Sequence, residues 1–121
     1  MDQRAVYRRV LGVRGEDLAV VFLERVGMRV LDRNWRVPAG EIDIVARDGR
    51  TLVVAEVKTR TSARFGHPLD ALTPARRFRL RGLGSAWAAR HRVAGRPLRV
   101  DGVGVLVVGG RVFVTHERGV G

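Results

Sequence analysis

The chain has 121 residues, with 23 Lys and Arg against 12 Asp and Glu, which gives a formal net charge of +11. The absence of cysteine excludes a disulfide framework and a thiolate zinc site. No apolar run approaches the ~18 residues of a membrane span, and the N-terminus lacks the apolar core of a signal peptide. We therefore expect one cytoplasmic domain over residues 1–121 that associates with polyanions, usually nucleic acid, unless its arginines are only solvated surface charge.

Residues 1–13 form a basic lead-in that is either helical or a frayed terminus, and the apolar spacing from Gly15 to Val26 predicts a helix. Glu16 and Asp17 would lie in its first turn, where the helix dipole favours carboxylates. Glu16 also lies on a side of this helix that is partly apolar. If that side packs on the strands that follow, Glu16 reaches them and Asp17 remains the capping acid.

Residues 28–36 are expected to form a strand, and residues 40–60 a hairpin whose turn is Asp48-Gly49. With that turn Glu41 faces Glu56 and Asp43 faces Val54. Directly opposed residues project from the same face of a sheet, as do residues two apart on one strand. One side of the hairpin would then carry four charged residues, Glu41, Asp43, Glu56 and Lys58.

Three carboxylates on one face repel one another by about 4 kcal/mol for a pair ~4 Å apart at an effective dielectric near 20. Either some of them are neutral with a raised pKa, or a cation lies among them. Carboxylate oxygens favour Mg²⁺, Mn²⁺ or Ca²⁺. Lys58 is the only lysine among the 23 cationic residues, and its compact charge can orient a water. The hairpin therefore predicts a divalent-metal site with an adjacent lysine.

The second half predicts a loop over residues 61–68 and a helix that starts at Thr73-Pro74 and ends near His91 or Val93. Four arginines cover its first two turns and form either a solvated face or a phosphate-binding patch: Arg76, Arg77, Arg79 and Arg81. Residues 98–108 and 111–116 predict two strands joined by Gly109-Gly110, and residues 118–121 a disordered tail.

The helix between Lys58 and Leu98 permits a right-handed crossover, so the strand over residues 98–108 is expected to lie parallel to the second strand of the central hairpin. Asp101 is expected to make a salt bridge.

The chain has a sequence pattern that resembles that of the PD-(D/E)XK nuclease superfamily: an acid on a helix, an acid on one strand and Glu-x-Lys on the next strand. These places are taken by Glu16, Asp43, Glu56 and Lys58. Longer segments occur in an order similar to the YraN family, a small bacterial family that is itself similar to archaeal Holliday junction resolvases. These segments are Gly15-Glu16-Asp17-Leu18-Ala19, Asn34-Trp35-Arg36, Gly40-Glu41-Ile42-Asp43, Glu56-Val57-Lys58-Thr59-Arg60, Phe65-Gly66-His67-Pro68 and Arg99-Val100-Asp101.

The resemblance implies an α/β fold with a restriction-endonuclease-like αβββαβ core, a mixed sheet flanked by two helices, and Mg²⁺-dependent (or Mn²⁺-dependent) hydrolysis of DNA. It implies metal binding by Asp43, Glu56, the Val57 carbonyl and Glu16, with Lys58 orienting the water or neutralising the oxyanion. Candidate nucleic-acid-binding residues are Arg36, Arg60, Arg64, Arg76 and Arg77. Family members often carry Lys where this chain has Arg76 and Arg77. Resolvases of this type usually work as dimers, so a homodimer is possible.

Three functions are compatible with these residues. The first is an endonuclease acting on branched or damaged DNA. The second is a nucleic-acid-binding protein that keeps the nuclease fold without turnover, although retention of Asp43, Glu56 and Lys58 argues against it. The third is a basic structural protein whose acids make ordinary salt bridges, and Glu41 could pair with Arg36 or Arg60 in any of the three.

Overall fold

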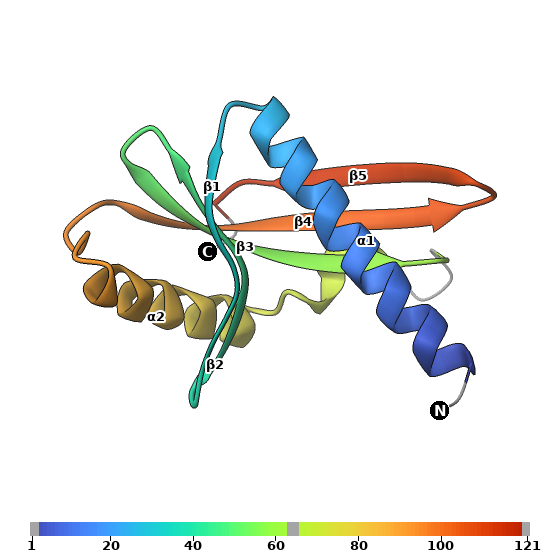
Figure 1. Cartoon of the computed structure of the whole chain (residues 1–121), viewed down its shortest axis with the longest axis horizontal. Coiled ribbons are helices and arrows are strands. Elements are labelled where there is room, and N and C mark those ends of the chain that lie inside the picture. The colour runs from blue at the N-terminus through green and yellow to red at the C-terminus, as the bar shows by residue number, and fades with distance from the viewer. Residues whose placement is uncertain (1–2, 63–65, 120–121) are drawn as a thin grey trace.

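The computed structural model describes residues 3–62 and 66–119, which form one mixed sheet with helices on both faces (Figure 1). The elements are α1 (Gln3–Arg25), β1 (Arg29–Val37), β2 (Gly40–Asp48), β3 (Thr51–Arg60), η1 (Pro68–Ala71), α2 (Pro74–Arg90), β4 (Leu98–Val108) and β5 (Arg111–Glu117). The strand order is β1-β2-β3-β4-β5, with β3 and β4 parallel and the other neighbours antiparallel. The expected αβββαβ core, its parallel crossover and the flanking helices are confirmed, and β5 extends the sheet.

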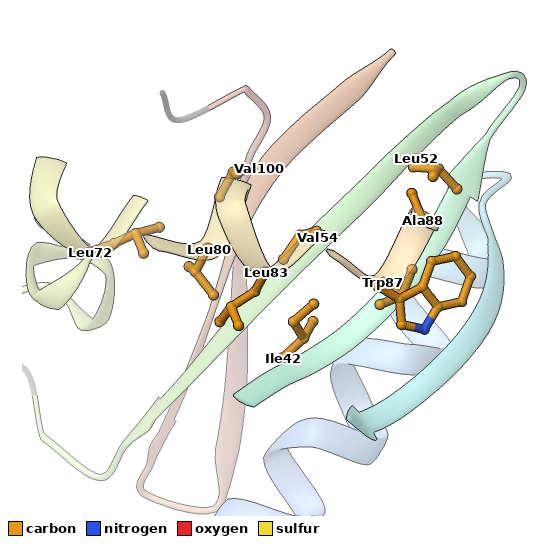
Figure 2. Packing of buried hydrophobic residues seen from close by; sticks show 10 residues of the cluster. Ile42, Leu52, Val54, Leu72, Leu80, Leu83, Trp87, Ala88 and Val100 are labelled. Carbon is orange, nitrogen blue, oxygen red and sulfur yellow. The ribbon is translucent and has the colours of Figure 1, made fainter. Parts of the chain in front are cut away.

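Each face of the sheet has its own hydrophobic core, one under each helix. The α1 side buries Ala19, Leu23, Met28, Ile44, Ala46, Val53, Ala55, Val103 and Val105. The α2 side buries Ile42, Val45, Leu52, Val54, Leu72, Leu80, Leu83, Trp87, Ala88 and Val100. Figure 2 shows the side chains of the second cluster, with Leu80, Leu83 and Trp87 of α2 facing the strands. Within the described residues, no helix is long and apolar enough to cross a membrane.

A glycine allows α2 to lie close to the centre of the sheet. A Cβ added to Gly84 would lie 2.6 Å from the Val54 side chain, so a larger residue there would push α2 away from the sheet. The far end of the helix is also tied to β1, because the Trp87 indole N–H donates to Asp32 over 2.8 Å. These contacts determine which side chains from the first turn of α2 can reach β3.

Helix α1 begins well before the predicted start at Gly15. No proline interrupts residues 3–25, and the helix continues through the glycines of this segment at a modest cost in stability. Glu16 and Asp17 therefore lie in the middle of a helix, and the prediction that Asp17 caps its first turn is wrong. At Gly15 the helix crosses β3 so closely that an added Cβ would overlap the Thr59 hydroxyl.

The central hairpin has a different turn from the predicted one. Asp48 pairs with Thr51 and Val45 with Val54, so the loop is Gly49-Arg50 instead of Asp48-Gly49. Gly49 has φ 60°, and glycine as the first of two loop residues is what a type II′ turn requires. Because the register differs from the predicted one by two residues, alternate side chains keep their faces.

Asp101, expected in a salt bridge, is fully buried on β4 at the centre of a polar cluster. It accepts hydrogen bonds from Arg99 at 2.8 and 3.1 Å and from the Gly119 backbone N–H at 3.0 Å, and pairs with His116 Nε2 at 2.9 Å. Burial raises the pKa of Asp101, but these bonds outweigh it and leave the pKa below its usual value. The expected salt bridge is confirmed.

The segment expected as a disordered tail, residues 118–121, is ordered at its start. Gly119 bonds Asp101, and the Arg118 guanidinium lies 3.7 Å from Asp48. Residues 120–121 lie outside the described residues.

Candidate functional site

The site begins where β2 and β3 separate. Their regular pairing ends at Ile44 opposite Ala55, and the next residues along are Asp43 and Glu56. Ile42 packs in the α2-side core whereas Ile44 packs in the α1-side core, so the alternation expected from the sequence is broken at Asp43. The Asp43 carboxylate accepts the Val57 backbone N–H at 2.9 Å, which fixes it against β3.

Asp43 is the most electrostatically perturbed carboxylate of the site. Burial raises the pKa of Asp43 to about 6, the hydrogen bond from Val57 opposes this rise, and the charges of three further acids add to it. Those acids are Glu56, Glu16 and Glu41, listed by decreasing effect. Together with Asp43 they form what we call the acidic cluster. The sequence predicted either a raised pKa or a cation among these acids, and the raised pKa is present at Asp43.

Glu56, on β3, is only 3 % exposed and is paired with two cations. Arg76 donates from Nε to Oε2 at 2.9 Å and from Nη2 to Oε1 at 3.1 Å, and the Lys58 ammonium lies 3.5 Å from Oε1. The hydrogen bonds to Glu56 raise the pKa of Arg76 further, despite the opposing effect of burial. Arg76 thus neutralises Glu56 in this structure, and the binding of nucleic acid by Arg76 stays a prediction.

The outer acids of the cluster are also paired. Arg33 Nη2 lies 3.3 Å from Glu16 and 2.6 Å from Asp17, and Arg36 lies 3.2 Å from Glu41. The pairing of Glu41 with Arg36 was one of the two expected from the sequence. Arg33 was missed, because its place beside α1 follows from helix packing and no local motif marks it.

A basic cleft of about 300 Å³ lies next to Glu56 at the start of α2. Its lining consists of Lys58, Ala71, Thr73, Ala75, Arg76 and Arg79. The Thr73 hydroxyl caps the helix by accepting the Arg76 backbone N–H at 3.2 Å. Arg79, one of the four arginines of the predicted phosphate-binding patch, lies three residues from Arg76 and on the same side of the helix.

The other predicted nucleic-acid-binding residues lie outside this cleft. The exposed Arg60 guanidinium donates to the Thr59 carbonyl at 2.9 Å, and Arg77 is half-buried on α2 but does not line the cleft. Arg36 is engaged by Glu41 on the β1–β2 hairpin. Arg64 lies outside the described residues. The structure thus brings Glu16, Asp43, Glu56 and Lys58 together with Arg76 and leaves the remaining arginines apart.

The residues fit a metal ion in chemical type and only partly in arrangement. Among residues 3–62 and 66–119, no three Asp, Glu, His or Cys side chains are close enough to hold one. Asp43 and Glu56 are hard oxygen donors on neighbouring strands, which suit Mg²⁺ or Mn²⁺ with water as the other ligands. At Glu56 the ion would compete with Arg76, which bonds both carboxylate oxygens. The predicted ligand from Val57 is its backbone carbonyl, and the Val57 backbone N–H donates to Asp43.

Comparison with known proteins places this site within a defined family. The profile of the family described as "Uncharacterised protein family UPF0102" matches residues 15–105, which include the whole acidic cluster and the basic cleft. A UPF0102 protein of Renibacterium salmoninarum is 52% identical over 112 residues, covering 92% of this chain and 95% of the relative. One from an Arthrobacter species is 54% identical over 113 residues (93% and 96%), and one from Streptomyces griseus 53% over 117 residues (93% and 97%). The chain therefore belongs to the UPF0102 family, which is the YraN family that its motifs resemble.

Proposed function

We propose that this protein is a metal-dependent endonuclease of the PD-(D/E)XK superfamily that hydrolyses phosphodiester bonds, with branched or damaged DNA as the expected substrate. The observation that carries the proposal is the pair of carboxylates, Asp43 and Glu56, at the point where β2 and β3 separate. Beside this pair lie Lys58, 3.5 Å from Glu56, and a cleft lined by further cations.

Asp43 and Glu56 would hold the ion, and the charge of Glu16, which raises the pKa of Asp43, would add to the attraction for a cation. When bound, Mg²⁺ or Mn²⁺ supplies a Lewis acid and an activated water. The cost of ionising Asp43 among other acids falls when a cation is present, which favours binding.

Lys58 has the position required of a residue that acts on the scissile phosphate. Its side chain is 29% exposed, it lines the basic cleft, and its ammonium contacts Glu56. From there it can donate to a phosphate oxygen and stabilise the charge that develops in the transition state. Arg79 would bind a neighbouring phosphate of the same strand, and the net charge of +11 would attract the polyanion.

One observation favours a second function, a nucleic-acid-binding protein without turnover. Glu56 is fully paired by Arg76 and Lys58, so the chain can satisfy this carboxylate without a metal. In that case the basic cleft would bind phosphate, and the acids would serve only to position Arg76.

Cleavage of a nucleic-acid panel separates the two functions. Single-stranded, duplex, flap and four-way-junction DNA, with matched RNA, are incubated with Mg²⁺, Mn²⁺ or EDTA. We expect cutting of one or more structures by the wild type with metal, and at least about 100-fold slower cutting by Lys58→Ala and Glu56→Gln. Arg96→Ala, which removes an exposed guanidinium from the loop between α2 and β4, is the matched control and should cut normally. Binding of the panel without cutting under any condition would contradict the nuclease and favour the second function.

A further inference from the structure

We propose that Arg76 couples the two halves of the site, so that a phosphate group in the basic cleft and a divalent cation at Asp43 and Glu56 strengthen each other's binding. This inference rests on the proposed function and concerns its regulation. The coupling acts through competition between Glu56 and a phosphate group for a single guanidinium.

Arg76 faces both ligands. Its Nε and Nη2 bond Glu56, while its side chain is 31% exposed and lines the cleft. The Glu56 side chain is only 4% exposed, so a ligand entering the cleft meets Arg76 before it meets the carboxylate. A phosphate group offers two oxygens in the geometry that the guanidinium uses for a carboxylate, and can therefore take over both donors.

A cation and Arg76 compete for Glu56. Each carboxylate oxygen already accepts a hydrogen bond from Arg76, and Lys58 lies near one of them. A divalent ion on the same oxygens would also be repelled by the adjacent guanidinium. The cation therefore binds more tightly once Arg76 has left Glu56, because the uncompensated charge on buried Glu56 then favours the cation.

The backbone around Arg76 is fixed, so this exchange needs only a side-chain movement. Its N–H is held by the Thr73 cap, and α2 is anchored to the sheet at Gly84 and through Trp87. Movement of the guanidinium from Glu56 into the cleft leaves the helix in place. Since coupling between two sites is reciprocal, phosphate should raise the cation affinity by the factor by which the cation raises the phosphate affinity.

The test measures Mn²⁺ binding by electron paramagnetic resonance, with sulfate as the probe for the phosphate group because it cannot be hydrolysed and does not precipitate Mn²⁺. Titrations are made with sodium sulfate and with sodium chloride at equal ionic strength. We expect sulfate to raise the Mn²⁺ affinity of the wild type on the order of tenfold, a usual size for coupling between sites. Arg76→Ala and Arg76→Gln should bind Mn²⁺ on the order of tenfold more tightly without sulfate, and sulfate should no longer change their affinity.

Control variants make the two possible failures distinguishable. Glu56→Gln and Asp43→Asn should lose Mn²⁺ binding and provide the correction for Mn²⁺–sulfate pairing, while Arg96→Ala should behave as wild type. The coupling is overturned if Mn²⁺ binding depends on Glu56 but sulfate does not change it. It is also overturned if sulfate raises the Mn²⁺ affinity of the Arg76 variants as much as that of the wild type. Either result leaves the proposed function standing. If neither the wild type nor either Arg76 variant binds Mn²⁺, with or without sulfate, the metal site fails and the inference fails with it.

Discussion

Replacement of Asp43 by Asn should stabilise the protein when no metal is present. The carboxylate has its pKa raised from 3.8 to about 6, chiefly by burial and then by neighbouring acids, so the fold favours its neutral form. A difference of about 2 pKa units corresponds to about 3 kcal/mol between the charged and neutral states. Asn has the shape of the neutral acid and an oxygen that can still accept the Val57 N–H.

The pH dependence follows from the sign of this shift. Between pH 3.8 and about 6 the folded chain keeps a proton on Asp43 that the unfolded chain has released, so stability falls as the pH rises through this window. At pH 4 the wild type and Asp43→Asn should therefore have nearly equal free energies of unfolding. As the pH rises, the free energy of unfolding of the variant should increasingly exceed that of the wild type, by up to about 3 kcal/mol at pH 7 and above.

Urea unfolding of both proteins in EDTA, at half-unit steps from pH 4 to 8, measures this difference directly. In a thermal scan, 3 kcal/mol corresponds to a rise of about 10 °C in Tm for a chain of this length. Added Mg²⁺ should raise the Tm of the wild type only. An Asn variant that is less stable than the wild type at pH 7, or a gap that does not change with pH, would refute the electrostatic description of the site.

Four further substitutions test the packing and the second polar cluster, each by urea unfolding at pH 7. Gly82→Ala and Gly84→Ala form a matched pair on α2: the first should stabilise by about 1 kcal/mol because open space surrounds it, and the second should destabilise because its Cβ would meet Val54 at 2.6 Å. Asp101→Asn should lower the free energy of unfolding by about 3 kcal/mol, and this loss should become smaller below pH 4. The sign is opposite to that of Asp43→Asn, which should raise the free energy of unfolding. Trp87→Phe should cost about 1 kcal/mol by removing the bond to Asp32. Equal effects at the two glycines would contradict the close approach of α2 to β3.

The sheet could be predicted largely from local patterns. Alternating and β-branched residues identified the strands, and a glycine beside Asp48 marked the central turn. The turn was displaced by one position because Asp48 pairs with Thr51 and is held by Arg99 at 3.0 Å, a contact from a strand fifty residues away. The grouping of Asp43 with Glu56 was unaffected, because a two-residue change in register does not alter which face a side chain occupies.

The partners of the acids could not be predicted in the same way. Arg76 looked like one of four similar arginines on α2, and only the close packing at Gly84 brings its side chain to Glu56. Arg33 likewise reaches Glu16 and Asp17 because α1 packs against β1. Contacts between helices and strands depend on packing distances, which local sequence patterns do not contain.

Buried Asp101 and partly buried Asp43, the aspartates of the two polar clusters, have opposite effects on stability. Asp101 is surrounded by donors that lower its pKa, so its charge stabilises the fold. Asp43 accepts one backbone N–H, but burial and the charges of neighbouring acids raise its pKa, so its charge destabilises the fold at neutral pH. A charge that the protein itself leaves uncompensated is stabilised by whatever cation binds there. If Mg²⁺ or Mn²⁺ raises the stability of the wild type to that of metal-free Asp43→Asn, the acidic cluster is a cation site. If neither ion does, the charge of the acidic cluster is compensated in some other way, and the proposal of a nuclease loses its main physical support.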